Sequence, residues 1–127
     1  MVWLSKRQSG EHYETLAEQY LIRQGLSSIE RNFHSKGGEL DLIMQEGTTI
    51  VFVEVRYRSN QHYGHAAETV TQSKMHKLIK TANVWLMKQG KSAHTTDFRF
   101  DLVAMHQQGK QICLLYTSDA ADDSLGV

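Results

Sequence analysis

Two apolar segments separated by a three-residue link constrain the fold of this chain more than any other feature. Residues 39–45 and 49–57 are both rich in Ile, Val, Leu and Phe. The link between them contains Gly47, as expected for a tight hairpin turn. We therefore expect two adjacent antiparallel strands, and with them a fold built on a β-sheet.

Two helices are expected, one on each side of this hairpin in the sequence. Residues 11–24 carry apolar side chains at the three- and four-residue spacing of an amphipathic helix, and Gly25 follows where a helix commonly ends. A second helix is expected to start at Thr71 or Ser73 and to run to about Lys88, with one apolar stripe. Each helix therefore has one face to bury against the sheet.

The remaining segments suggest how the sheet is completed. We expect a short strand at residues 28–33, where the pattern of apolar residues is ambiguous, and a polar loop at residues 59–71. A strand at 98–105 follows the second helix, so a right-handed crossover would place it parallel to the strand at 49–57. A final strand is expected near Gln111. The sequence thus predicts a single α/β domain with a mixed β-sheet flanked by helices.

Composition excludes several classes of protein. The one cysteine, Cys113, cannot form an internal disulfide or a cysteine zinc site, and the seven histidines show no helical zinc spacing. No apolar run is long enough to cross a bilayer, and the N-terminal residues lack the order of a signal peptide. We therefore expect a cytoplasmic protein that does not interact with a membrane.

The formal net charge of zero conceals an uneven distribution. Between Arg56 and Thr96 there are seven basic residues and one acid, Glu68. Lys74, Lys77 and Lys80 lie outside the apolar stripe of the second helix and could contact phosphates. A solvated helix face is the more common explanation of such a row.

The predicted hairpin also carries acidic residues that could meet on one side of the sheet. Side chains alternate along a strand, so Glu39 and Asp41 share one face of their strand. Glu54 and Arg56 likewise share one face of the next strand. If these faces align, Asp41 and Glu54 would suit a hard cation such as Mg²⁺. An ion pair between Glu54 and Arg56 explains the pattern about equally well, and a lone Asp41 is more often solvated.

Glu14 could complete such a site from the first helix. It lies at the edge of the apolar stripe, three residues before Ala17, and could lean toward the strand acids. From the pattern alone, an exposed acid in the favourable first turn of the helix is the better interpretation.

Taken together and in order, five short segments resemble the YraN family of uncharacterised bacterial proteins. They are residues 38–43, 52–58, 63–64, 71–74 and 99–101, and the similarity extends from about Gly10 to Met105. This family is grouped with the restriction-endonuclease-like PD-(D/E)XK nucleases. The resemblance therefore implies a restriction-endonuclease-like fold and a Mg²⁺- or Mn²⁺-dependent endonuclease-like protein acting on DNA, including branched structures.

The resemblance also implies roles for individual residues. Asp41 and Glu54 would be metal ligands with the Val55 carbonyl, and Glu14 would complete the acidic site. The nucleic acid would be held by basic residues of the third strand and second helix: Arg58, Lys74 and Lys77.

One position departs from the superfamily pattern, because Arg56 occupies the place of its catalytic lysine. Arginine does not lose its proton in proteins, so Arg56 cannot be a general base, although it can hold a phosphate or orient a water. The alternative is a non-catalytic module that binds nucleic acid or a partner and pairs Arg56 with Glu54. A protein that never meets nucleic acid is a third possibility.

The C-terminal segment looks different from the rest. Residues 113–122 resemble a translated sequencing adapter, and the family resemblance fades there. We therefore expect a native domain at residues 1–112 and a non-native tail at 113–127. Without the tail the chain has 14 basic and 11 acidic residues and is mildly basic.

Overall fold

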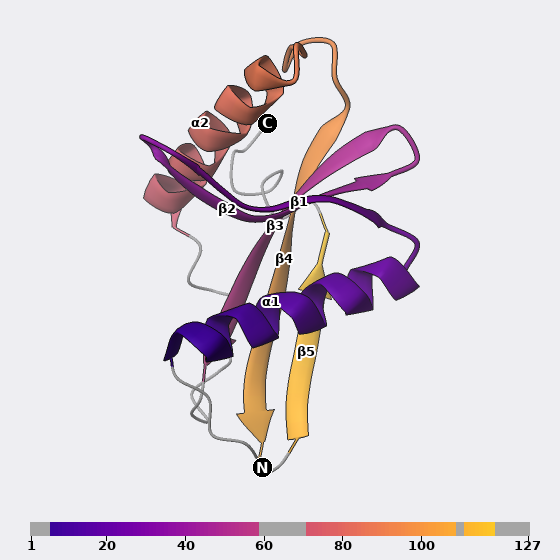
Figure 1. Cartoon of the computed structure of the whole chain (residues 1–127), viewed down its shortest axis with the longest axis vertical. Helices are drawn as coiled ribbons and strands as arrows, with labels where there is room; N and C mark the ends of the chain where they lie inside the picture. Colours follow the sequence, from indigo (N-terminus) through magenta and orange to yellow (C-terminus); the bar gives the residue numbers. More distant parts are fainter. Residues whose placement is uncertain (1–5, 59–70, 109–110, 119–127) are drawn as a thin grey trace.

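A five-stranded mixed sheet with one helix on each face forms the structure (Figure 1), a computed structural model that describes residues 6–58, 71–108 and 111–118. The strands lie in chain order, β1-β2-β3-β4-β5. The elements, in sequence, are α1 (Lys6–Arg23), β1 (Ser27–Ser35), β2 (Gly38–Glu46), β3 (Thr49–Arg58), α2 (Gln72–Lys88), β4 (Phe98–Gln108) and β5 (Gln111–Thr117).

The strand directions confirm the predicted topology. β2 and β3 form the antiparallel hairpin, and β3 and β4 pair in parallel from Ile50↔Phe98 to Arg58↔His106. The connection between these parallel strands contains α2, because a parallel pair needs a crossover. β1 and β5 are antiparallel to their neighbours and form the two edges. The mixed α/β sheet flanked by helices is therefore confirmed.

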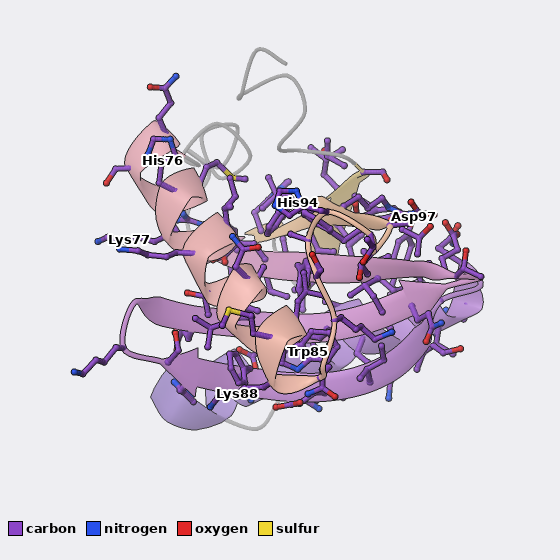
Figure 2. The ribbon with its side chains drawn as sticks, turned by 90° about the horizontal axis from the view of Figure 1, so that it is seen from above. His76, Lys77, Trp85, Lys88, His94 and Asp97 are labelled. Atoms are coloured by element: carbon purple, nitrogen blue, oxygen red, sulfur yellow. The ribbon has the colours of Figure 1, made fainter. Side chains whose placement is uncertain are left out.

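Alternation along β3 divides the core between the two helices. Phe52 packs into the cluster that contains Trp85 of α2, whereas Val51 and Val53 pack into the cluster that contains Leu21 of α1. Figure 2 shows α2 lying across the strands, with Trp85 on its sheet side and His76 on its outer side. Glu54 follows Phe52 by two residues, so it lies on the face that α2 covers.

Helix α2 lies close to both β1 and β2. The buried Trp85 ring donates a hydrogen bond from Nε1 to Glu30 Oε1 at 3.0 Å. Gly38 begins β2 with a φ of 150°, and a Cβ there would lie 3.2 Å from Thr81 Oγ1. The start of β2 can therefore approach the middle of α2 closely, because residue 38 has no side chain.

Several element boundaries differ from the predictions. α1 begins at Lys6 instead of residue 11, and β1 spans Ser27–Ser35, which is longer than the expected strand. β5 pairs with β4 through Thr117, which lies beyond residue 112. This pairing does not test the origin of residues 113–127, which stays a prediction. The polar loop at 59–70, with Tyr63 and Gly64, and the tail aspartates lie outside the described residues. In the described part of the chain no helix is long and apolar enough to cross a membrane.

Candidate functional site

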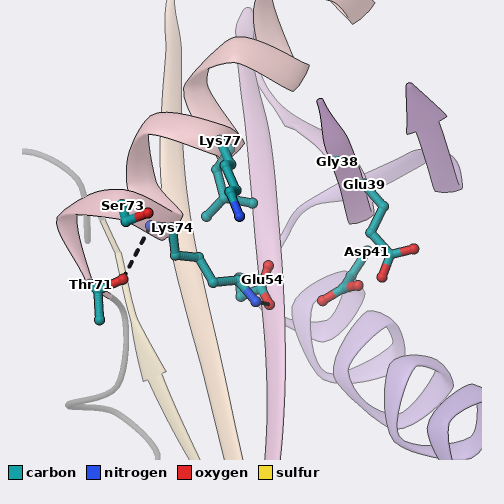
Figure 3. Close-up of a pocket in the computed structure, with 9 residues that line it drawn as sticks. Gly38, Glu39, Asp41, Glu54, Thr71, Ser73, Lys74 and Lys77 are labelled. Atoms are coloured by element: carbon teal, nitrogen blue, oxygen red, sulfur yellow. Dashed lines mark hydrogen bonds and ion pairs between the residues drawn. The ribbon is translucent and has the colours of Figure 1, made fainter. Parts of the chain in front are cut away.

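A cavity of about 320 Å³ opens where the start of β2, the middle of β3 and the first turns of α2 meet (Figure 3). Acids line it from the strands, and cations line it from the helix. The polar side chains around it include Glu39, Asp41, Glu54, Thr71, Lys74 and Lys77. The structure therefore brings together two predicted acids and two predicted phosphate contacts.

Asp41 lies where the β2–β3 ladder stops. The registered pairs end at Leu42↔Val53, so Asp41 and Glu54 occupy the next facing positions. Instead of a backbone pair, the Val55 N–H donates to Asp41 Oδ2 at 2.8 Å. The carboxylate thus satisfies a backbone donor that the ladder leaves open. This hydrogen bond ties the acid of one strand to the other strand.

The pKa of Asp41 is raised to about 7. Burial is the largest cause, followed by repulsion from Glu54, and the charges of Glu14 and Glu39 raise the pKa further. The hydrogen bond from the Val55 N–H acts in the opposite direction. A negative charge on a carboxyl group surrounded in this way is unfavourable, and either a bound proton or a nearby cation removes that cost.

Glu54 contacts two cations. Lys74 Nζ lies 3.0 Å from Glu54 Oε1, and Arg56 Nε lies 3.7 Å from the same atom. Lys74 lines the cavity, whereas Arg56 is not among the described residues that do. The predicted ion pair with Arg56 is therefore present, but a lysine from α2 is closer to the acid.

Glu14 is not the exposed helix acid that the pattern favoured. Its side chain is only 17% exposed, and Oε1 lies 3.7 Å from Arg31 Nη2. Burial raises the pKa of Glu14, although a hydrogen bond with Asn32 and the charge of Arg31 lower it. The charge of Glu14 reaches Asp41, yet Glu14 is not among the described residues that line the cavity.

The carboxylates of the cavity fit a hard divalent cation only if that cation takes few protein ligands. No three His, Cys, Asp or Glu side chains in the described part of the chain are grouped to hold a metal ion. Mg²⁺, however, commonly takes one or two carboxylates and completes its shell with waters. Asp41 and Glu54 supply two oxygen donors at one cavity, so a cation with few protein ligands fits these residues.

Arg58, the remaining predicted phosphate contact, is not among the described residues that line the cavity. Arg58 ends β3 opposite His106, and its side chain lies outside the described part. Thr71 and Glu39 line the cavity although neither was predicted as a site residue. The sequence did indicate Thr71 as a possible helix cap and Glu39 as sharing a strand face with Asp41.

A family model matches residues 13–105, and its description is "Uncharacterised protein family UPF0102". The chain belongs to the UPF0102 family. This confirms the YraN-family resemblance, because UPF0102 is that family. A UPF0102 protein of Vibrio campbellii is 59% identical over 108 residues, which cover 85% of this chain and 88% of the relative. Others from Vibrio cholerae and Aliivibrio salmonicida are 54% and 55% identical, covering 88% and 85% of this chain and 92% and 88% of the relatives.

Among solved structures, this UPF0102 chain is similar to SfsA of Pyrococcus furiosus in complex with Ca²⁺. The two share 16% sequence identity with a TM-score of 0.42, over 90% of this chain and 64% of the other. A likeness at this level does not assign a function. The UPF0102 relatives are bacterial proteins that match most of the chain.

Proposed function

We propose that this UPF0102 protein is a divalent-metal-dependent endonuclease-like protein that hydrolyses phosphodiester bonds in DNA, including branched structures, in the bacterial cytoplasm. The observation that carries the proposal is the cavity between β2, β3 and α2. Asp41 and Glu54 line one side of it, and Lys74 and Lys77 line the other. A site of this kind combines donors for a hard cation with positive charge for a phosphate.

The raised pKa of Asp41 supports a cation at the acidic side. Three other carboxyl groups act on Asp41, since Glu54, Glu14 and Glu39 all raise its pKa. A divalent cation would offset this repulsion. Asp41 and Glu54 would hold Mg²⁺ or Mn²⁺ together with the Val55 carbonyl. The bound ion would lower the pKa of water and stabilise negative charge on the phosphate.

The basic side of the cavity supports a nucleic-acid substrate. Lys74 and Lys77 stand one helical turn apart and both line the cavity, so they can hold successive phosphates without reading bases. In the reaction, a water oxygen bonds to phosphorus and the bond from phosphorus to the leaving oxygen breaks. The proton released by the water ends on that leaving oxygen.

Purified protein with Mn²⁺ and branched or flapped DNA tests the proposal. We expect nicking or cleavage that disappears in an Asp41→Ala, Glu54→Ala double variant. Thermal unfolding of that variant serves as the control for folding. Equal activity of the folded double variant and the wild type would contradict the proposal.

A non-catalytic module that binds nucleic acid is the second candidate. It is favoured by one observation, the pairing of Glu54 with both Lys74 and Arg56, which balances this acid without a metal. Calorimetry with Mn²⁺ separates the two candidates. Heat of binding that is lost in Asp41→Ala supports the enzyme, whereas DNA binding without any such heat supports the module.

A further inference from the structure

The geometry points to Lys74 of α2 as the catalytic cation of the proposed phosphodiester hydrolysis, in a chain whose strand position two residues after Glu54 is an arginine. The inference rests on the proposed function, because it names a residue of the same site. It concerns what Lys74 does once a phosphate is bound. Three features of the structure lead to it.

The first feature is the distance of each cation from the acid pair. Lys74 Nζ lies 3.0 Å from Glu54 Oε1, which is hydrogen-bonding distance, whereas Arg56 Nε lies 3.7 Å from that oxygen. Glu54 itself is only 12% exposed, so few positions remain from which a cation can reach it. The lysine occupies the closer one.

The second feature is the side from which each cation approaches. Lys74 lines the cavity together with Asp41 and Glu54, and its side chain is 39% exposed. The Arg56 side chain is 15% exposed and is not among the described residues that line the cavity. Figure 3 shows the Lys74 side chain extending from the first turn of α2 to Glu54. A phosphate entering the cavity would therefore meet Lys74.

The third feature is the way the backbone holds Lys74 in place. Thr71 is the N-cap of α2, and its Oγ1 accepts a hydrogen bond from the Lys74 N–H at 3.1 Å. Ser73 and Thr71 border the same cavity. The cap fixes the backbone from which the lysine side chain starts. This reduces the ordering that a bound phosphate would otherwise have to impose.

These features suit the charge changes of the reaction. An ammonium group has three rotatable donors, whereas a guanidinium is a planar fork. One donor of Lys74 is directed to Glu54, and the others can point to the phosphate oxygens or the attacking water. Negative charge grows on those oxygens in the transition state, and a fixed donor there accelerates the reaction more than it strengthens binding.

The test compares wild type, Lys74→Ala, Lys74→Gln and Lys74→Arg on branched DNA with Mn²⁺. The exposed Lys91 lies outside the site, so Lys91→Ala is the matched control for loss of one lysine. We measure kcat and KM, the heat of Mn²⁺ binding and thermal unfolding. We expect Lys74→Ala and Lys74→Gln to lower kcat about 100-fold while KM changes much less. Lys74→Arg should recover part of kcat, and Mn²⁺ should still bind to all variants.

The outcomes separate this inference from the proposed function. Absence of cleavage by the wild type would overturn both. If the wild type cleaves and Lys74→Ala raises KM with kcat unchanged, Lys74 only binds the phosphate backbone and the inference fails. Loss of Mn²⁺ binding in the folded Lys74→Gln protein would also overturn it, because the lysine would then act by arranging the acids. Lys74→Gln retains a long polar side chain, so it supplies the result if Lys74→Ala does not fold.

Discussion

Asp41 shows how a single buried carboxyl group can make the stability of the fold depend on pH. In the folded protein its pKa is about 7, and burial is the main reason. In an unfolded chain an aspartate has a pKa of about 3.9. The folded state therefore retains a proton on Asp41 between these two values, and the free energy of unfolding falls as the pH rises from about 4 to about 7. Strongly raised pKa values of this kind are found most often at functional sites.

Replacing Asp41 by asparagine should remove this loss of stability at higher pH. The amide oxygen can still accept from the Val55 N–H, but it carries no charge. Without divalent cations, we expect Asp41→Asn to raise the free energy of unfolding at pH 8 on the order of 1 to 3 kcal/mol, with little gain at pH 4. Denaturant unfolding at both pH values measures this. The exposed Asp97 provides a matched Asp97→Asn control, which should show no gain. A similar gain at both pH values would contradict the explanation by charge.

Helix α2 contributes to stability and to the site through different faces. Its inner face buries Trp85 and Leu86, whereas its first turns bring Lys74 and Lys77 to the cavity. The position of the first turn therefore determines where both lysines lie. That position depends on the cap at Thr71, which lies between the loop and the helix.

Removing the cap hydroxyl should weaken the start of α2. In Thr71→Ala the Lys74 N–H loses its acceptor, so we expect the free energy of unfolding to fall by about 1 kcal/mol. Thr71→Ser keeps an acceptor at the same place and should remain within a few tenths of a kcal/mol of the wild type. Denaturant unfolding measures both variants. An equal loss in Thr71→Ser and Thr71→Ala would show that the hydroxyl is not what stabilises the helix start.

At the scale of the whole molecule, the charges are separated across the cavity. The acids that line it come from the sheet, and the lysines come from α2, where Lys74 also pairs with Glu54. Lys77 contributes to the cavity and also to a second, open hollow along the outer side of α2, which Lys80 and His76 line as well. A nucleic-acid backbone bound at the cavity could therefore continue along the helix.

Salt dependence of DNA binding tests this arrangement. Each phosphate contact made by a lysine releases a counterion, so we expect Lys77→Ala to weaken binding of all DNA sequences alike and to reduce the slope of log K against log salt by about one. Fluorescence anisotropy in EDTA measures binding without cleavage. Lys91→Ala is the control and should leave the slope unchanged. Salt-independent binding would contradict the phosphate contacts. The absence of DNA binding would favour a protein that never meets nucleic acid.

Much of the architecture could be predicted because its signals are local. The two apolar segments on either side of Gly47 predicted the hairpin, and the spacing in residues 71–88 predicted α2. The parallel pairing of β3 and β4 also followed, because a helix between two strands of one sheet restricts their direction. The ends of β1 were predicted less well, since its pairing with β2 extends the strand beyond its own pattern. The start of α1 was placed too late, because residues 6–10 carry no apolar spacing.

The acids Asp41 and Glu54 were recognisable in the sequence by themselves, because two strands joined by a tight turn bring nearby residues face to face. The tertiary structure decided which cation lies closest to Glu54. Arg56 is two residues from Glu54 in the chain, yet Lys74 lies closer to that acid in space. The contact between Lys74 and Glu54 depends on how α2 packs across the sheet, and the burial of Glu14 depends in the same way on α1. Both follow from packing between distant segments, which a pattern of neighbouring residues does not contain.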